Sequence, residues 1–257
     1  MTETRADGIV LVSPAGSTGD IWWRVRNELT SELDVRVFDH RTVPVDPGTG
    51  RSFEAVAEAL IDRLHAWRFQ RPVGVGISMG GMVLQYAAAR APHLFHSLVI
   101  GNTNHRQGDA QREAILRRSA RALAPDFEGY VTDVLSRWFS LTFRDSNPSD
   151  VVRTRRILQN VTPGEHAEDW RMISALNATP LLPRITCPVT VIAADGDEST
   201  PVRTQEEIAN LLPLSHLTVI GGGAHMSCVE RPDVWARSIQ EAASAAPGTH
   251  GRPAPSK

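Results

Sequence analysis

The sequence predicts an α/β fold in which a doubly wound, mostly parallel sheet is interrupted by a helical insertion. Short, continuous apolar runs alternate with segments of helical periodicity, and such runs are typical of strands buried on both faces of a parallel sheet. The alternation stops between about residues 105 and 180, where helical patterns follow one another with no convincing strand. A chain of 257 residues is long enough to bury the core of one large domain that carries such an insertion.

The first part of the predicted core, residues 1–104, alternates strands with helices. Val56, Leu60 and Leu64 recur at helical spacing, and Ser52 before them is a residue type that caps helix N-termini. The strands expected in this part are 8–12, 35–38, 73–77 and 97–100, and the expected helices are 21–33, 53–67 and 80–91.

The insertion, residues 105–180, is predicted to form a helical cap, and the core resumes at 181–246. The helices expected in the cap are 110–123, 127–139, 150–158 and 166–176. In the second part of the core we expect strands at 189–193 and 216–220 and helices at 205–212 and 232–245. The sheet should therefore have about six strands. The tail, residues 247–257, is rich in Gly, Pro and Ser and is predicted to be disordered.

Residues 76–80 read Gly-Ile-Ser-Met-Gly, which is the pattern G-x-S-x-G, and they lie between a predicted strand and a predicted helix. In that setting the pattern predicts a nucleophile elbow, a strained turn that exposes the hydroxyl of Ser78 above the sheet. The glycines two before and two after the serine avoid a collision within the turn. The same turn would aim the Met79 N–H, at the start of the helix, toward a developing oxyanion.

A serine hydroxyl needs a base to take its proton, and the base needs an acid that orients it. The stretch after the strand 189–193 contains Asp195 and Asp197, and the stretch after the strand ending at 220 contains His225 in Gly-Gly-Gly-Ala-His. Because both stretches follow predicted parallel strands, we expect them at the same edge of the sheet as Ser78. Either aspartate could supply the acid on this evidence alone.

These motifs together resemble the α/β-hydrolase superfamily over nearly the whole chain. The sequence Asp-Glu-Ser-Thr-Pro at 197–201 is similar to the family's D-x-x-T-P, which implies that Asp197 is the acid, with Asp195 as the competing choice. The sequence around His225 resembles the family's H-x-x-x-x-E-x-P loop, which implies that His225 is the base. The resemblance therefore implies a Ser78-His225-Asp197 triad and the α/β-hydrolase fold.

A narrower likeness links the chain to 3-oxoadipate enol-lactonases and their relatives. It is carried by residues 76–82, by Gly101-Asn-Thr, by Arg-Trp-Phe at 137–139 and by the His225 loop. This resemblance implies a substrate pocket lined by Trp138 and Arg137, and we expect Trp22 to line it as well. The competing interpretation is that Trp138 and Phe139 form the core of the cap.

The sequence departs from the family pattern after the first strand, where His-Gly is usual. Aligned on Trp22, the chain has Ser13-Pro14 in place of His-Gly, and Ala15 then falls at the position of the second oxyanion N–H donor. Pro14 restricts its own φ angle and the conformation of Ser13, so the loop could have another shape. The R-G-x-G-x-S loop of the family is replaced by Arg-Thr-Val-Pro-Val at 41–45, and we expect the family's leading β-hairpin to be missing. The strand at 35–38 would then form an uncovered sheet edge, which is consistent with a homo-oligomer or a covering loop.

The bulk composition excludes several classes of partner. A formal net charge of -2 argues against nucleic acid as the main partner. The two cysteines lack a C-x-x-C spacing, so no disulfide framework or zinc site is expected, and neither a metal nor an organic cofactor is implied. No apolar run approaches the roughly 18 residues that span a bilayer, and the first residues do not resemble a signal peptide. We therefore expect a cytoplasmic protein that acts on a small molecule and not on a membrane.

Three functions remain open on the sequence alone. The leading hypothesis is hydrolysis of a lactone or carboxylic ester through an acyl-enzyme. The second keeps the same triad but uses it for C–C cleavage, acyl transfer or cyclisation, which the altered loop at Ser13-Pro14 favours. The third is a non-catalytic binding module on a hydrolase fold.

Overall fold

The sheet of the computed structural model consists of six parallel strands in the order β2-β1-β3-β4-β5-β6, counted over residues 5–30 and 32–245, which the structure describes. The strands are β1 (Ile9–Val12), β2 (Val35–Phe38), β3 (Val73–Ile77), β4 (Ser97–Gly101), β5 (Val189–Ala194) and β6 (Ser215–Ile220). Each lies within one or two residues of its predicted position. The prediction of a doubly wound sheet of about six strands is confirmed. It succeeded because continuous apolar runs such as Ile9–Val12 mark strands that are buried along their whole length.

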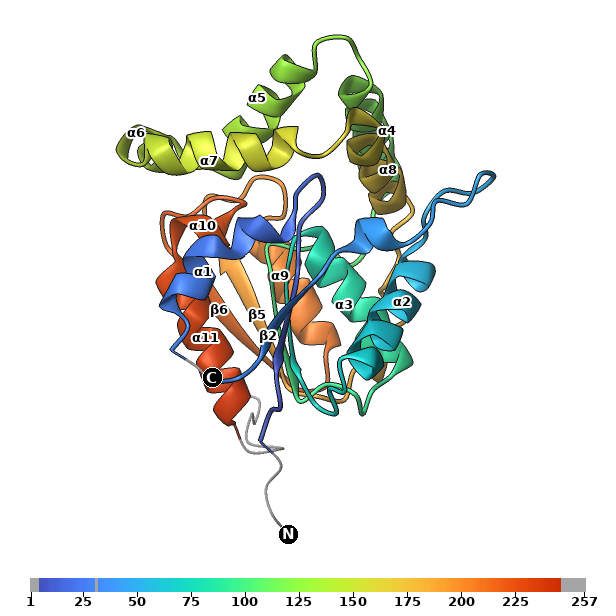
Figure 1. The fold of residues 1–257 in the computed structure, drawn as a ribbon, viewed down its shortest axis with the longest axis vertical. Helices are drawn as coiled ribbons and strands as arrows, with labels where there is room; N and C mark the ends of the chain where they lie inside the picture. The colour runs from blue at the N-terminus through green and yellow to red at the C-terminus, as the bar shows by residue number, and fades with distance from the viewer. Residues whose placement is uncertain (1–4, 31, 246–257) are drawn as a thin grey trace.

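Helices cover both faces of this sheet (Figure 1). Helices α1 (Trp23–Glu28) and α11 (Pro232–Ser244) pack together on one face, whereas α2 (Phe53–Ala66), α3 (Met79–Arg90) and α9 (Val202–Leu211) lie on the other. The predicted helix 21–33 is wrong at both ends. Its first two residues belong to a 3₁₀ turn, Gly19–Trp22, and the helix ends at Glu28 because Leu29 turns to an extended conformation before the poor helix former Thr30.

Five helices connect β4 to β5 and lie above the carboxyl ends of the strands (Figure 1). They are α4 (Asp109–Ala122), α5 (Phe127–Trp138), α6 (Leu141–Ser146), α7 (Pro148–Gln159) and α8 (Pro163–Ser174), and we call them the cap. Four of them lie where the sequence predicts helices. The short helix α6 was not predicted, because six residues are too few to show a helical period, although Ser140 caps it by accepting a hydrogen bond from the Phe143 N–H.

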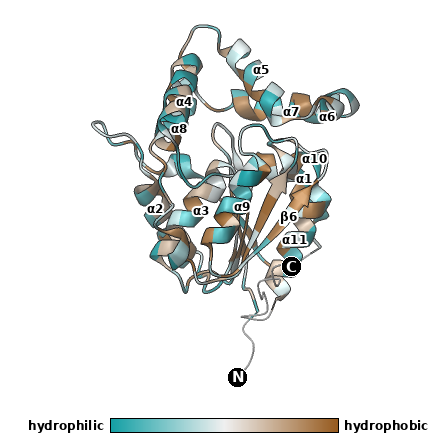
Figure 2. Cartoon of the chain, turned by 180° about the vertical axis from the view of Figure 1, so that it is seen from behind, coloured by the Kyte–Doolittle hydropathy of each residue, from teal (hydrophilic) through white to brown (hydrophobic). Residues whose placement is uncertain are grey.

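Two apolar clusters, one on each face of the sheet, form the core. Figure 2 shows the visible strands as apolar, while the outer helices mix apolar and polar residues. No helix of the described part of the chain is long and apolar enough to cross a membrane. The predicted disordered tail, 247–257, lies outside the described residues. Strand β2 ends the order of the sheet, so its outer edge pairs with no other strand in the residues that are described, and the suggested homo-oligomer stays a prediction.

Candidate active site

Ser78 lies in a sharp turn between β3 and α3, with φ 53° and ψ −121°. This conformation is rare for a residue with a side chain and is tolerated only where the surroundings enforce it. A Cβ atom on Gly76 would lie 2.5 Å from the backbone of Gly80, and one on Gly80 would collide with the carbonyl oxygen of Val12. The two glycines of the motif therefore allow both the turn and its close approach to the end of β1, as the sequence predicted.

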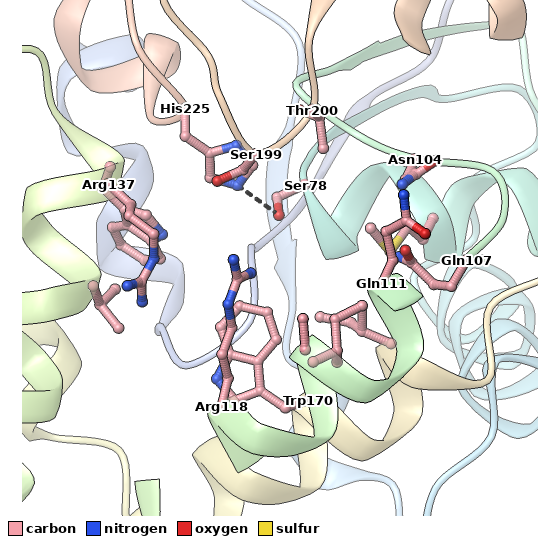
Figure 3. Close-up of a pocket in the computed structure, with 16 residues that line it drawn as sticks. Ser78, Asn104, Gln107, Gln111, Arg118, Arg137, Trp170, Ser199, Thr200 and His225 are labelled. Atoms are coloured by element: carbon pink, nitrogen blue, oxygen red, sulfur yellow. Dashed lines mark hydrogen bonds between the residues drawn. The ribbon is translucent and has the colours of Figure 1, made fainter. Parts of the chain in front are cut away.

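Three side chains from different loops form one hydrogen-bonded row at this edge of the sheet. The Nε2 atom of His225, which follows β6, lies 3.0 Å from Ser78 Oγ, and its Nδ1 lies 2.8 Å from the Oδ2 of Asp197, which follows β5 (Figure 3 marks the first contact). An ionised carboxylate can only accept, so Nδ1 carries the proton and Nε2 is left to accept from the serine hydroxyl. The row thus has the geometry in which an imidazole can remove the serine proton.

Asp197 is the aspartate of this row, and its carboxylate is fully enclosed. Besides His225 it accepts hydrogen bonds from the side chains of Thr200 and Asn102 and from the N–H groups of Ser199 and Thr200. Burial alone would raise the pKa of Asp197, but His225 and these hydrogen bonds hold it well below its ordinary value.

Asp195, the competing choice in the sequence, lies elsewhere. It is exposed, and its carboxylate accepts a hydrogen bond from the Gly222 N–H at 2.7 Å. It forms no hydrogen bond with the imidazole of His225 and instead stabilises the loop that carries this histidine.

The two predicted oxyanion donors come from neighbouring segments, because a Cβ atom on Gly80 of α3 would meet the carbonyl oxygens of Val12 and Ser13 at the end of β1. Met79 is the first residue of α3, so its N–H has no acceptor within the helix. Ala15 lies in the loop after β1, and in the part of the chain described its N–H has no hydrogen-bond partner. On the two sides of Ala15, the Pro14 carbonyl accepts from the Ser17 hydroxyl at 3.0 Å and the Gly16 N–H donates to Asp169 at 2.8 Å.

A cavity of about 130 Å³ opens between Ser78 and the cap (Figure 3). Ser78, His225 and Ser199 line it on the side of the sheet, with Trp138 and Trp170 contributed by the cap. Apart from two arginines, the remaining lining consists of apolar side chains and of polar, mostly amide, side chains: Met82, Ala114, Ile115, Val134, Ile173, Asn104, Gln107, Gln111 and Thr200. A small ligand in this cavity would lie directly over the serine.

Two cap arginines also reach the cavity, Arg118 from α4 and Arg137 from α5 (Figure 3). Arg118 stacks over the ring of Trp170, with 5.3 Å between its guanidinium carbon and the ring centroid. Within the described residues, neither guanidinium forms an ion pair within 4.0 Å of a carboxylate. Burial lowers the pKa of both, and the charge of Arg137 lowers that of Arg118 further. The cavity is therefore a favourable place for an anion.

Two of the three predicted pocket residues line the cavity, and the third does not. Arg137 and Trp138 line the cavity. Trp22 was predicted wrongly: it is completely buried and packs edge-on against Trp235, with ring centroids 5.6 Å apart. The 3₁₀ turn that carries it lies against the short helix α10 (Ser227–Glu230), and Trp235 belongs to α11. Arg118 and Trp170 were missed, since cap helices carry no motif that says which face meets the cavity.

Residues 9–232 match the family model described as the alpha/beta hydrolase fold. A 3-oxoadipate enol-lactonase of Acinetobacter baylyi is 27% identical over 211 residues, which cover 80% of this chain and 75% of that protein. A pimeloyl-[acyl-carrier protein] methyl ester esterase of Chromobacterium violaceum is 26% identical over 93% of this chain and 96% of that protein. Among solved structures, an enol-lactonase from Burkholderia xenovorans LB400 matches with a TM-score of 0.86 at 21% identity, covering 95% of this chain and 94% of that one.

Proposed function

The chain belongs to the α/β-hydrolase fold family, and from this premise we propose that it hydrolyses a small carboxylic ester or lactone through an acyl-enzyme on Ser78. The observation that carries the proposal is the row Ser78-His225-Asp197, with contacts of 3.0 and 2.8 Å, at the floor of a cavity. The row supplies the nucleophile, the base and the group that orients the base.

In the proposed reaction, Ser78 Oγ attacks the carbonyl carbon while its proton passes to His225 Nε2. Asp197 keeps the imidazole in the reactive tautomer and stabilises the imidazolium that forms. The developing oxyanion accepts hydrogen bonds from the N–H groups of Met79 and Ala15. His225 then protonates the leaving alcohol, or the ring-opened alkoxide of a lactone, and activates the water that releases the acid from Ser78.

We further propose that the substrate carries a carboxylate remote from the scissile bond. The support is the pair Arg118 and Arg137, whose guanidinium groups reach the cavity without a carboxylate partner in the described chain. Guanidinium groups bind carboxylates with two parallel hydrogen bonds, and a partly dehydrated site strengthens that attraction. An enol-lactonase and a methyl ester esterase among the relatives agree with an ester or lactone substrate.

The test is turnover of a panel of lactones and 4-nitrophenyl esters, each with and without a remote carboxylate, by wild type and by Ser78→Ala. We expect Ser78→Ala to lose at least about 10⁴-fold in kcat, because the covalent step is removed. The matched control, Ser199→Ala, removes another hydroxyl from the cavity and should keep most of the activity.

The same assay tests the arginines and the fate of the solvent oxygen. Arg118→Gln and Arg137→Gln should raise KM about tenfold or more for the carboxylated substrates and leave the neutral ones nearly unchanged. In ¹⁸O-labelled water, hydrolysis places the label in the acid product. An unlabelled product would instead indicate acyl transfer or cyclisation, and equal turnover by Ser78→Ala would contradict the covalent mechanism.

A further inference from the structure

The loop after β1, residues 13–17, is bonded to the cap through one carboxylate. Asp169 on α8 accepts a hydrogen bond from the Gly16 N–H at 2.8 Å with one oxygen, and its other oxygen lies 2.9 Å from His40 Nε2. The Asp169 and His40 side chains are almost completely buried, and Arg51 Nη1 lies 3.8 Å from the same carboxylate. Burial alone would raise the pKa of Asp169, but His40 and the Gly16 N–H hold it below its ordinary value, so the group is an anion.

The same loop is in direct steric contact with α8. Gly16 has φ +66°, a conformation that favours glycine, and a Cβ atom there would overlap the imidazole of His166 on α8. His166 is itself fixed, because its Nε2–H donates to the Leu158 carbonyl at 2.9 Å and its Nδ1 accepts from the Tyr130 hydroxyl at 3.1 Å. The cap therefore holds the loop by shape as well as by charge.

These contacts determine which way the Ala15 N–H points. In a trans peptide the N–H points opposite to the carbonyl of the preceding residue. The Ser17 hydroxyl fixes the Pro14 carbonyl at 3.0 Å and so fixes the peptide plane that contains the Ala15 N–H. Asp169 fixes the next plane through the Gly16 N–H. Both peptide planes that flank the Ala15 Cα are thus held, one by the loop itself and one by the cap.

We propose that Asp169 is a positioning residue for the oxyanion site, because its carboxylate holds loop 13–17 in the shape that leaves the Ala15 N–H free for the oxyanion. This inference rests on the proposed function and deepens it. Ser13-Pro14 stands where His-Gly is usual, and the support for the loop comes from a cap helix more than 150 positions away in the sequence. The cap then does more than cover the substrate: its docking completes the site.

The experiment compares wild type with Asp169→Ala, Asp169→Asn and the control Glu168→Gln. Glu168 is the neighbouring residue on α8 and is also buried. Its carboxylate accepts hydrogen bonds from the Arg51 N–H and from the Arg171 side chain, and it accepts none from loop 13–17. The measurements are kcat and KM for 4-nitrophenyl acetate, the melting temperature, and the inhibition constant of benzeneboronic acid. Ser78 Oγ adds to the boron of this inhibitor, the serine proton passes to His225, and the tetrahedral boronate anion places one of its two hydroxyl oxygens in the oxyanion site.

We expect Asp169→Ala to lower kcat and kcat/KM together by about 10²–10³, the cost of one lost oxyanion donor, and to weaken boronate binding by a similar factor. Asp169→Asn keeps an oxygen that accepts from the Gly16 N–H, so it should recover most of this loss. Glu168→Gln should lower the melting temperature without a change in boronate affinity. If Asp169→Ala fails to fold, Ser17→Ala, which frees the other peptide plane, should show the same parallel loss of kcat and boronate affinity.

A loss that appears only in KM or only in the melting temperature would overturn the inference, as would a parallel loss in Glu168→Gln. If Asp169→Ala has the kcat and the boronate affinity of wild type while Ser78→Ala is inactive, the inference is overturned and the proposed function stands. A wild-type protein that neither hydrolyses the panel of esters nor binds the boronic acid would overturn the proposed function, and the inference with it.

Discussion

The row at the serine and the junction between cap and loop each contain a buried aspartate–histidine pair, and the two pairs do different things. Asp197–His225 and Asp169–His40 have nearly the same contact distance, 2.8 and 2.9 Å, and both aspartates are closed to solvent. The difference lies at the second ring nitrogen. In His225 it meets Ser78 Oγ beside the cavity, whereas in His40 it is buried with no partner in the described chain.

A buried carboxylate–imidazole pair is therefore not by itself a sign of a catalytic base. The imidazole must also face a nucleophile, and the nucleophile must face a cavity that a substrate can enter. His225 meets both conditions in the structure, since it lines the cavity with Ser78. His40 meets neither, and its aspartate instead joins two segments, α8 and loop 13–17, that are far apart in the chain.

The largest difference between the pairs should appear when the same change is made in both. Asp197→Asn replaces one carboxylate oxygen by an NH₂ group that can donate to His225 Nδ1. The imidazole proton then lies on Nε2, so Nε2 can no longer accept the proton of the Ser78 hydroxyl. We expect kcat to fall about 10⁴-fold. Asp169→Asn should lower kcat less than tenfold, because the Gly16 N–H keeps its acceptor. Steady-state kinetics on one activated ester checks both, and equal losses would mean that the two pairs do not differ in role.

Stability should show the reverse order. Asp169→Ala leaves His40, Arg51 and the Gly16 N–H without their buried acceptor, and breaking such a pair costs about 3–5 kcal/mol of unfolding free energy. Asp197→Ala strands the donors of Asn102, Ser199 and Thr200 as well as His225, but Ser199, Thr200 and His225 line the cavity, where water can take the place of the carboxylate. We therefore expect a smaller cost of about 1–3 kcal/mol. Urea unfolding followed by fluorescence measures both. A larger loss for Asp197→Ala would contradict our assignment of Asp197–His225 to catalysis and of Asp169–His40 to joining the cap to loop 13–17.

The sequence predicted one of these pairs and not the other, for a physical reason. Parallel strands buried on both faces are continuous apolar runs, so the sheet could be located, and loops that follow such strands meet at one edge, so Ser78, Asp197 and His225 could be grouped. Asp169 and His40 lie on a cap helix and on a short turn, and which residues those segments bring together depends on the packing of the cap. One signal was present: Asp169 lies three residues after His166 and four before Ile173, so a charged residue shares the buried face of a helix.

The pocket shows the same limit. Arg137 and Trp138 were found through a resemblance that covers part of α5, but Arg118 and Trp170 come from α4 and α8, whose periodicity indicates a helix and not its neighbours. Trp22 was also predicted to line the pocket. The turn at Gly19–Trp22 carries it back over the sheet to Trp235 instead.

The smallest expected effect is on the pH dependence of stability. It tests whether Asp169 is ionised where it holds His40 and the Gly16 N–H. The pKa of Asp169 is lowered in the folded protein, whereas an unfolded aspartate has a pKa near 3.9. The unfolded state therefore takes up this proton first as the pH falls, so the stability that Asp169 contributes is complete above about pH 5 and is lost progressively below about pH 4. Asp169→Asn lacks this contribution, while His40 and Arg51 are present in both proteins. The difference in unfolding free energy between wild type and Asp169→Asn should thus shrink from pH 5 toward pH 3, as measured by urea unfolding at each pH. A difference that grows toward pH 3 would mean that Asp169 is held in its protonated form, and the Gly16 N–H would then donate to a neutral carboxyl group and not to a carboxylate.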